Sequence, residues 1–163
     1  MALLVIRHAK AGKRNRAHPD DHKRPLDERG WRQAEGLVEL LAEYPLDRLV
    51  SSGHLRCTQT FEPLAEQRDL PIVVRPELQE GASREETVAL MNELGDRAAL
   101  CTHGDVLEEL FGEAGQKGST RVVELVHQRN RLLAAGSSCS SGRTTIGRSR
   151  CSANGSKVWV HRR

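Results

Sequence analysis

The stretch that decides the fold is ALLVIRH, residues 2–8, in which five apolar residues run directly into Arg7 and His8. A continuous apolar run of this length is typical of a strand that is buried on both faces of a sheet. In open parallel sheets, ligands bind beyond the carboxyl ends of the strands. We therefore expect a buried β-strand whose carboxyl end presents Arg7 and His8 to a site.

Outward from this stretch, strand-like apolar segments alternate with segments that have the apolar period of helices. Asp27 and Ser83 are residue types that begin helices, and Gly95 is suited to end one. This alternation predicts an α/β fold, a three-layer sandwich with a mostly parallel central sheet flanked by helices. The expected strands are 2–8, 47–51, 71–74 and 97–102, the expected helices are 27–43, 53–67, 83–95 and 106–111, and 119–126 is expected to pair with 131–134 as a hairpin.

Residues 9–25 are expected to form a long loop, because they are polar and basic and contain two prolines. A loop of this length is uncommon in a compact domain unless it serves a site. Its basic side chains, Lys10 and Lys13 among them, follow directly after His8. They indicate either a solvated surface or a contact with an anionic ligand, and the two interpretations have about equal weight.

The composition changes abruptly near the C-terminal end. Seven of the 21 residues in 137–157 are serine, and glycine and arginine make up much of the rest. Low hydrophobicity of this kind predicts a disordered or loosely attached segment. We therefore expect a domain over 1–136 followed by a Ser/Gly/Arg-rich tail over 137–163, in which 158–160 could dock as an edge strand.

Length and hydropathy place limits on the class of protein. The chain has 163 residues, of which 37% are hydrophobic, and this suits one domain with one core. No stretch approaches the roughly 20 apolar residues of a membrane span, and the N-terminal apolar run is too short for a signal peptide. We expect a soluble, cytoplasmic protein without a membrane partner. No oligomeric state is predicted.

Several classes of site are not indicated. The four cysteines are widely spaced and form no CxxC pair, so neither a zinc site nor a disulfide framework is expected, and Cys57 and Cys101 are interpreted as small core residues. No residues have the spacing of metal ligands, and no metal or cofactor is predicted. Nucleic-acid binding is disfavoured, because only 3% of the residues are aromatic and no recognised DNA-binding pattern occurs.

Chemically useful side chains stand at the ends of three expected strands. Arg7 and His8 end the first, Ser52 follows the second with Arg56 shortly after it, and His103 follows the fourth. Because carboxyl ends of parallel strands share one edge of a sheet, two histidines and two arginines are expected to converge. Each of these residues alone is weak evidence, since a single histidine or arginine is more often structural or exposed.

This set is sufficient for phosphoryl transfer without a metal. A neutral imidazole is a competent nucleophile toward phosphorus, and arginine forks match phosphate oxygens two at a time. Nearby arginines also disfavour the protonated ring, so the lone pair of the nucleophile stays available. The second histidine can hydrogen-bond the phosphoryl oxygens as charge develops.

Four segments in order resemble the histidine phosphatase superfamily, which has the phosphoglycerate mutase-like fold. They are LLVIRHAKAG (3–12), with Ala9 where the family usually has glycine, RPLDERGWRQAEGL (24–37), LVSSGHLRCTQTFEPL (49–64) and CTHG (101–104). The resemblance runs from about residue 2 to 112 and is closest to the short, phosphohistidine-phosphatase-type branch. With KGSTRVVEL (117–125), the chain also resembles the phosphatase domain attached to some actinobacterial Nudix hydrolases, although it contains no Nudix box.

The resemblance implies a role for each matching residue. His8 would be phosphorylated, and Arg7, Arg56 and His103 would hold the phosphoryl group. The family usually protonates the leaving group from an acidic residue in a Leu-x-Glu segment, and LQEG nominates Glu80. The alternative, that Glu80 is an ordinary surface glutamate, has about equal weight.

The resemblance also implies a class of substrate. The chain lacks the long insertions that roof the pocket in the sugar-phosphate enzymes of the family, so we expect a phosphoprotein such as phosphohistidine, or a nucleotide. Lys10, Lys13 and Ser52 are further candidate substrate-binding residues. The alternative function is a catalytically weak phosphate-binding or regulatory module on the same fold, and turnover of p-nitrophenyl phosphate would distinguish the two.

Overall fold

The computed structural model describes residues 2–13, 20–126, 151–153 and 156–162. Every strand and helix expected before residue 127 is present, with ends shifted by a few residues. The strands are β1 (Leu3–Arg7), β2 (Arg48–Ser51), β3 (Ile72–Val74), β4 (Ala98–Thr102), β5 (Thr120–Val126), β6 (Cys151–Ala153) and β7 (Ser156–Arg162). The helices are α1 (Glu28–Leu40), α2 (Leu55–Arg68), α3 (Arg84–Leu94) and α4 (Gly104–Phe111), with short 3-10 turns η1 (Asp21–Lys23) and η2 (Pro76–Leu78).

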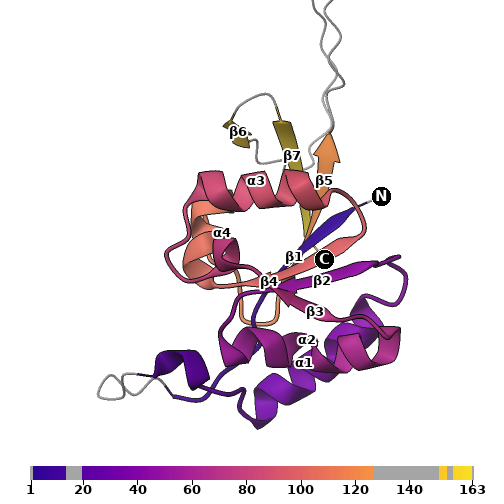
Figure 1. Ribbon diagram of the computed structural model, residues 1–163, viewed down its shortest axis with the longest axis vertical. Helices are drawn as coiled ribbons and strands as arrows, with labels where there is room; N and C mark the ends of the chain where they lie inside the picture. The colour runs from indigo at the N-terminus through magenta and orange to yellow at the C-terminus, as the bar shows by residue number, and fades with distance from the viewer. Residues whose placement is uncertain (1, 14–19, 127–150, 154–155, 163) are drawn as a thin grey trace, which may run out of the picture.

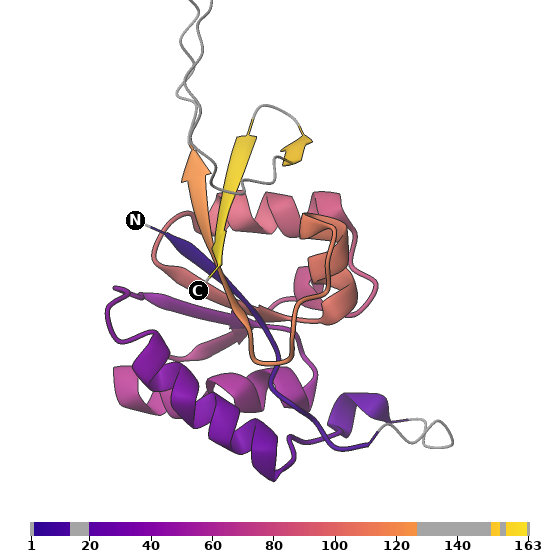
Figure 2. The ribbon, with the colours of Figure 1, turned by 180° about the vertical axis from the view of Figure 1, so that it is seen from behind.

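In the described part of the chain, the strands form one sheet in the order β3-β2-β4-β1-β5-β7-β6. The first four strands in this order are parallel, and β5, β7 and β6 continue the sheet by antiparallel pairing. Helices α1 and α2 lie on one face and α3 and α4 on the other (Figures 1 and 2). The predicted α/β sandwich with a mostly parallel central sheet is confirmed.

Strand β1 runs through the middle of the core, as its uninterrupted apolar sequence predicts. Leu3 and Val5 point to the side of the sheet covered by α3 and α4, and Leu4 and Ile6 point to the side of α1 and α2. All four side chains are completely buried. A strand with a helical layer on each face needs apolar residues at every position, because successive side chains enter opposite layers.

The register of the parallel strands gives three of them a common end. β4 lies between β1 and β2, with Arg7 beside Thr102 and Ser51 beside Cys101. The residues that follow these strands therefore emerge at one edge of the sheet.

The helix boundaries agree with the expected caps. The Asp27 carboxylate accepts a hydrogen bond from the Gly30 amide, and Ser83 forms a capping box at the start of α3. Helix α1 ends at Leu40 rather than near residue 43. The carbonyl oxygens of Leu41 and Ala42, just beyond this end, accept hydrogen bonds from Arg68 of α2. No helix of the described residues is long and apolar enough to cross a membrane.

Only part of the structure expected for the C-terminal region falls within the described residues and can be compared with the prediction. The second strand of the expected hairpin, 131–134, lies outside the described residues, and β5 pairs with β1 and β7 instead. β7 includes 158–160, which were expected to dock as an edge strand, but β6 takes the edge. Residues 137–150 also lie outside the described part, so a separate tail over 137–163 stays a prediction.

Candidate active site

The predicted site residues meet at the edge of the sheet where β1, β4 and β2 end. His8 follows β1, His103 follows β4 and Ser52 follows β2, while Arg56 lies in the first turn of α2. The rings of His8 and His103 have centroids 5.3 Å apart and meet edge to face. The topology thus brings both histidines together, as expected from the order of the motifs.

A cavity of about 510 Å³ opens beside His8, and most of the charged side chains around it are cationic. Arg56, His103 and Ser52 are buried and are not part of its wall. The cavity therefore presents one histidine and a basic rim to an incoming molecule. The charged residues of its wall are Arg7, Lys10, Lys13, Arg24 and Lys117, together with Asp27 and Glu80.

His8 is held as a neutral ring in one tautomer. The side chain is 5% exposed, and its Nδ1 lies 2.7 Å from the carbonyl oxygen of Ala9. A carbonyl can only accept, so Nδ1 carries the proton and Nε2 carries the lone pair. Burial, followed by the positive charges of Arg56 and Arg7, lowers the pKa of His8 from 6.5 to about 4 against the opposing effect of the Ala9 hydrogen bond. At neutral pH the ring is uncharged and Nε2 is available as a nucleophile.

Arg7 lies directly against the start of α4. Its Nη1 donates to the carbonyl oxygen of Gly115 at 2.6 Å. A Cβ atom on Gly104 would lie 2.7 Å from Nη2, so the glycine leaves the space that the guanidinium fills. The Nε atoms of Arg7 and Arg56 are buried without hydrogen-bond partners in the described part of the chain. Buried donors of this kind are uncommon, and an anionic ligand is one way of satisfying them.

Arg56 is completely buried and contacts two carboxylates. Its Nη1 donates to the main-chain oxygen of Asp21 at 3.0 Å and to its carboxylate at 3.1 Å. Its Nη2 donates to Oε1 of Glu80 at 2.6 Å and to Nδ1 of His103 at 3.3 Å. A phosphoryl group that binds Arg56 would compete with these carboxylates.

His103 has both ring nitrogens bound to protein groups. It is the N-cap residue of α4 and is 1% exposed. Because arginine can only donate, Nδ1 accepts from Arg56, and Nε2 carries the proton and donates to the Ser52 hydroxyl at 2.8 Å. Burial, then Arg56 and His8, lower the pKa of His103 to about 2. The expected contact of His103 with a phosphoryl group therefore requires Arg56 to turn away from Nδ1.

The remaining predicted residues divide into two groups. Lys10, Lys13 and Glu80 line the cavity, with Lys10 in an ion pair with Asp27 at 3.0 Å. Glu80 has a side chain 35% exposed and reaches from the cavity to Arg56. Ser52 is fully buried behind the cavity, so the structure places its hydroxyl among the histidines rather than at the surface that a substrate would meet.

Gly30 and Gln33 of the RPLDERGWRQAEGL segment position the loop that follows His8. A Cβ atom on Gly30 would collide with the carbonyl oxygen of Lys10, so α1 can approach this loop only with glycine in its first turn. Gln33 accepts from the Lys10 amide at 2.9 Å and donates to the Lys117 carbonyl at 3.1 Å. Two segments of the cavity wall are thereby tied to one helix.

Two neighbouring residues of α2 hold the same loop from the other side. Thr60 accepts from the Ala9 amide at 3.0 Å and donates to the Arg56 carbonyl at 2.6 Å. Gln59 accepts from the Leu26 amide at 2.9 Å. The polar residues after Arg56 therefore connect the arginine helix to the nucleophile loop.

Among the residues that were not found from the sequence are Asp21 and His54, which bond Arg56 and Ser52, and Lys117 of the cavity wall. Asp21 bonds Arg56 and also pairs with Arg24, whose Nε is 2.8 Å from its carboxylate. His54 is buried, and its Nδ1 lies 3.0 Å from the Ser52 hydroxyl. The available signal for His54 was its place between Ser52 and Arg56, at the end of a strand that leads to the site.

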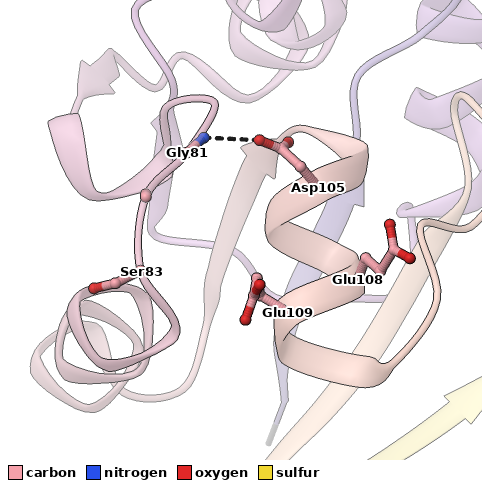
Figure 3. A pocket seen from close by; sticks show the side chains of 6 residues that line it. Gly81, Ser83, Asp105, Glu108 and Glu109 are labelled. Atoms are coloured by element: carbon pink, nitrogen blue, oxygen red, sulfur yellow. Dashed lines mark hydrogen bonds between the residues drawn. The ribbon is translucent and has the colours of Figure 1, made fainter.

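A second hollow, of about 310 Å³, lies between the segment after η2 and α4 (Figure 3). The carboxylate of Asp105 accepts from the Gly81 amide at 2.7 Å, and Glu108 and Glu109 also line the hollow. Its acidic lining disfavours anions, whereas the cavity at His8 attracts them.

Comparison with known proteins assigns the family. The sequence model of the histidine phosphatase superfamily (branch 1) matches residues 3–131. An 8-oxo-(d)GTP phosphatase of Mycolicibacterium smegmatis is 37% identical over 141 residues, which are 76% of this chain and 44% of that protein. The chain thus spans less than half the length of this relative. It belongs to the histidine phosphatase superfamily, a family of phosphate-hydrolysing enzymes.

Solved structures give the same fold. A protein assigned as the phosphohistidine phosphatase SixA of Agrobacterium tumefaciens has a TM-score of 0.65 and 26% identity, over 76% of this chain and 90% of that one. The α-ribazole phosphatase of Shigella flexneri has a TM-score of 0.60 at 19% identity, over 78% and 92% of the two chains, and shows the fold alone.

Proposed function

We propose that the chain is a metal-independent phosphatase that forms a phosphohistidine at His8. The observation that carries this proposal is the state of His8, a buried neutral ring whose Nδ1 is fixed by the Ala9 carbonyl and whose Nε2 is therefore the nucleophile. A basic cavity lies beside it, which would concentrate phosphorylated substrates.

In the first step, Nε2 of His8 attacks phosphorus as the bond between phosphorus and the leaving group breaks. The developing charge lies on the phosphoryl oxygens, and Arg7 and Arg56 neutralise it. Both guanidinium groups have a buried Nε without a partner in the described residues, which supports this role. Glu80 is an ion-pair partner of Arg56 in the empty site; when the phosphoryl group takes Arg56, Glu80 is proposed to take up a proton from water and to pass it to the leaving group.

In the second step, water attacks the phosphorus atom, the bond to Nε2 breaks, and inorganic phosphate leaves. Glu80, having given up its proton in the first step, takes one from this water and releases it when phosphate leaves and the pair with Arg56 forms again. The same two arginines serve both steps, because each transition state has charge on the same oxygens.

The basic rim of the cavity favours a substrate that carries more negative charge than one phosphoryl group. Burial first, then Arg7, Arg24 and Lys10, lower the pKa of Lys117, and Asp27 opposes them, so the surrounding cations repel Lys117 more than Asp27 attracts it. A nucleotide with two or more phosphates would relieve this repulsion, and the M. smegmatis relative acts on a nucleotide.

A phosphohistidine protein is the second candidate substrate. The open cavity has room for a protein side chain, and the SixA protein of A. tumefaciens is assigned as a phosphohistidine phosphatase. A panel with nucleoside di- and triphosphates and a phosphohistidine protein would rank the two classes by kcat/KM. A cytoplasmic location stays a prediction.

The test of the phosphohistidine is His8→Ala. The variant should lose phosphatase activity and keep its fold, and brief incubation of the wild type with labelled substrate should leave an acid-labile, base-stable label that His8→Ala lacks. Arg32→Ala is a control away from the cavity, because Arg32 is exposed on α1 and pairs with Glu28; it should take up the label as the wild type does. Retained activity in His8→Ala would remove the residue from the nucleophile role.

The alternative function is a phosphate-binding module with little catalysis. The observation in its favour is that Arg56 is bonded to two carboxylates, with which a phosphoryl group must compete. Such a module would bind inorganic phosphate in calorimetry but would not turn over p-nitrophenyl phosphate at any pH.

A further inference from the structure

Behind the cavity, a single hydroxyl connects two buried histidines. The Ser52 hydroxyl lies 2.8 Å from Nε2 of His103 and 3.0 Å from Nδ1 of His54. His54 is 4% exposed, and its ring contacts both His103 and the exposed His22, with centroid distances of 4.5 and 4.3 Å. His54 is the N-cap residue of α2, but its side chain makes no capping hydrogen bond. The proposed mechanism assigns His54 no role.

Arg56 determines which atom donates and which accepts in each of these hydrogen bonds. Arg56 can only donate, so Nδ1 of His103 accepts and Nε2 carries the proton. Nε2 therefore donates to Ser52. A hydroxyl has one proton, and with His103 donating to it, Ser52 gives that proton to Nδ1 of His54.

In the empty site, Arg56 donates both to Nδ1 of His103 and to Oε1 of Glu80, which lies 3.6 Å from that nitrogen. A phosphoryl group that takes Arg56 removes this shared donor. When phosphoryl oxygens take Arg56, the lone pair on Nδ1 of His103 would face negative charge. Only an N–H at Nδ1 attracts those oxygens. A neutral His103 can present one if its Nε2 becomes an acceptor. Ser52, at 2.8 Å, is a nearer donor to Nε2 than the Cys57 thiol at 3.5 Å, and a Ser52 that donates to His103 can accept from Nδ1 of His54.

We propose that His54 is a positioning residue that, through the Ser52 hydroxyl, sets which nitrogen of His103 carries the proton. In the change, Nδ1 of His103 takes a proton from water, and Nε2 of His103 passes its proton to Ser52. Ser52 passes its own proton to Nδ1 of His54, and Nε2 of His54 releases one to water. Each ring keeps one proton, and the net charge does not change. The inference rests on the proposed phosphoryl site.

The surroundings of His54 support a neutral ring in both states. The groups that face it are Arg56 of α2, His22 and Asp21 of η1, Glu80 after η2, and His103 before α4. Burial first, then Arg56 and His22, lower the pKa of His54, and the two carboxylates oppose them. A change of tautomer avoids placing a further positive charge beside Arg56.

The direct test is the tautomer of His103 in histidine-labelled protein, measured by long-range proton–nitrogen correlation with and without inorganic phosphate. In the wild type, the proton should be on Nε2 without phosphate and on Nδ1 with saturating phosphate. His54→Phe keeps a ring but cannot bond Ser52, so the change should be lost. His54→Asn places an amide near the Nδ1 position that can accept or donate, and it should retain the change. Ser52→Ala should behave like His54→Phe.

Kinetics provide a second readout on p-nitrophenyl phosphate. His54→Phe should lower kcat about tenfold or more, and His54→Asn should stay within about threefold of the wild type, as expected for a partner that orients a catalytic ring. Thr58→Ala is the control in the same helical turn, since its hydroxyl donates to the Leu55 carbonyl of its own helix, and it should be unaffected.

Two results would overturn the inference: a wild type in which phosphate does not move the proton, or a His54→Phe variant in which it still does. An inactive wild type would refute the proposed phosphatase, but the tautomer measurement would still decide the role of His54. Thermal unfolding of each variant shows whether it is folded.

Discussion

Arg7 and Gly104, one at the end of β1 and the other at the start of α4, occupy a space that has room for only one side chain. A Cβ atom on Gly104 would lie 2.7 Å from one nitrogen of the Arg7 guanidinium and 2.8 Å from its central carbon. The guanidinium is also held by the Gly115 carbonyl, so it has little freedom to move aside. The glycine after His103 therefore determines where Arg7, the proposed phosphate-binding arginine, sits.

Gly104→Ala is expected to lower kcat/KM by about tenfold or more while the fold persists, because small displacements of positioning groups are costly to phosphoryl transfer. Alanine is favoured over glycine in a helix, and α4 should not be weakened. Activity on p-nitrophenyl phosphate and the melting temperature are measured together. Gly36→Ala is the control, since a Cβ there meets nothing within 4 Å. Full activity in Gly104→Ala would show that the position of Arg7 does not matter.

The lowered pKa of His8 predicts a dependence of stability on pH. The ring titrates at about 4 in the folded protein and near 6.5 when unfolded, so between these values only the unfolded state binds the proton. The free energy of unfolding should therefore fall as the pH is lowered through this window, with a contribution from His8 of about 3 kcal/mol at most.

His8→Asn isolates this contribution, because the amide can still donate to the Ala9 carbonyl but does not titrate. Urea unfolding at pH 7.5, 5.5 and 4.5 gives the difference in stability between wild type and variant. The wild type should lose stability relative to His8→Asn as the pH falls. A difference that stays constant over this range would mean that His8 titrates normally in the folded protein.

Much of this site could be predicted from the sequence because it depends on strand order. A buried strand is apolar at every position, and side chains that end parallel strands share an edge, so His8 and His103 could be paired before any distance was known. The caps at Asp27 and Ser83 are local patterns and were also correctly predicted.

The interactions that were not predicted depend on side-chain directions and on the path of a loop. Asp21 reaches Arg56 across 35 residues, through a segment with no period to reveal its course. Ser52 was expected to face the substrate, but its hydroxyl turns inward to His54 and His103. No pattern of residue types states which way a serine at a strand end will point.

Chelators are expected to leave the activity unchanged. In the proposed mechanism, Arg7 and Arg56 supply the positive charge that a metal ion supplies in other phosphatases. The rate on p-nitrophenyl phosphate should be the same in buffer and after dialysis against EDTA. A loss that a divalent ion restores would contradict the arginine-based mechanism.

The last prediction separates Arg56 from Glu80, which are in contact in the structure with 2.6 Å between Nη2 and Oε1. Arg56 meets phosphoryl charge whatever the leaving group is, and the loss of one such contact costs on the order of a hundredfold in rate. Glu80 acts on the leaving group, and a nitrophenolate leaves readily without a proton while an alkoxide does not. The two roles therefore differ in how they depend on the substrate.

The experiment compares Arg56→Ala and Glu80→Gln on p-nitrophenyl phosphate and on an alkyl phosphate. Arg56→Ala should be severely impaired on both, while Glu80→Gln should be impaired mainly on the alkyl phosphate. Because Arg56→Ala leaves the carboxylates of Asp21 and Glu80 without their buried partner, Arg56→Lys is measured beside it; it keeps the charge and loses the two-pronged contact. Equal losses for Glu80→Gln on the two substrates would remove Glu80 from the acid role. Mild effects of both Arg56 variants would place the phosphoryl group elsewhere.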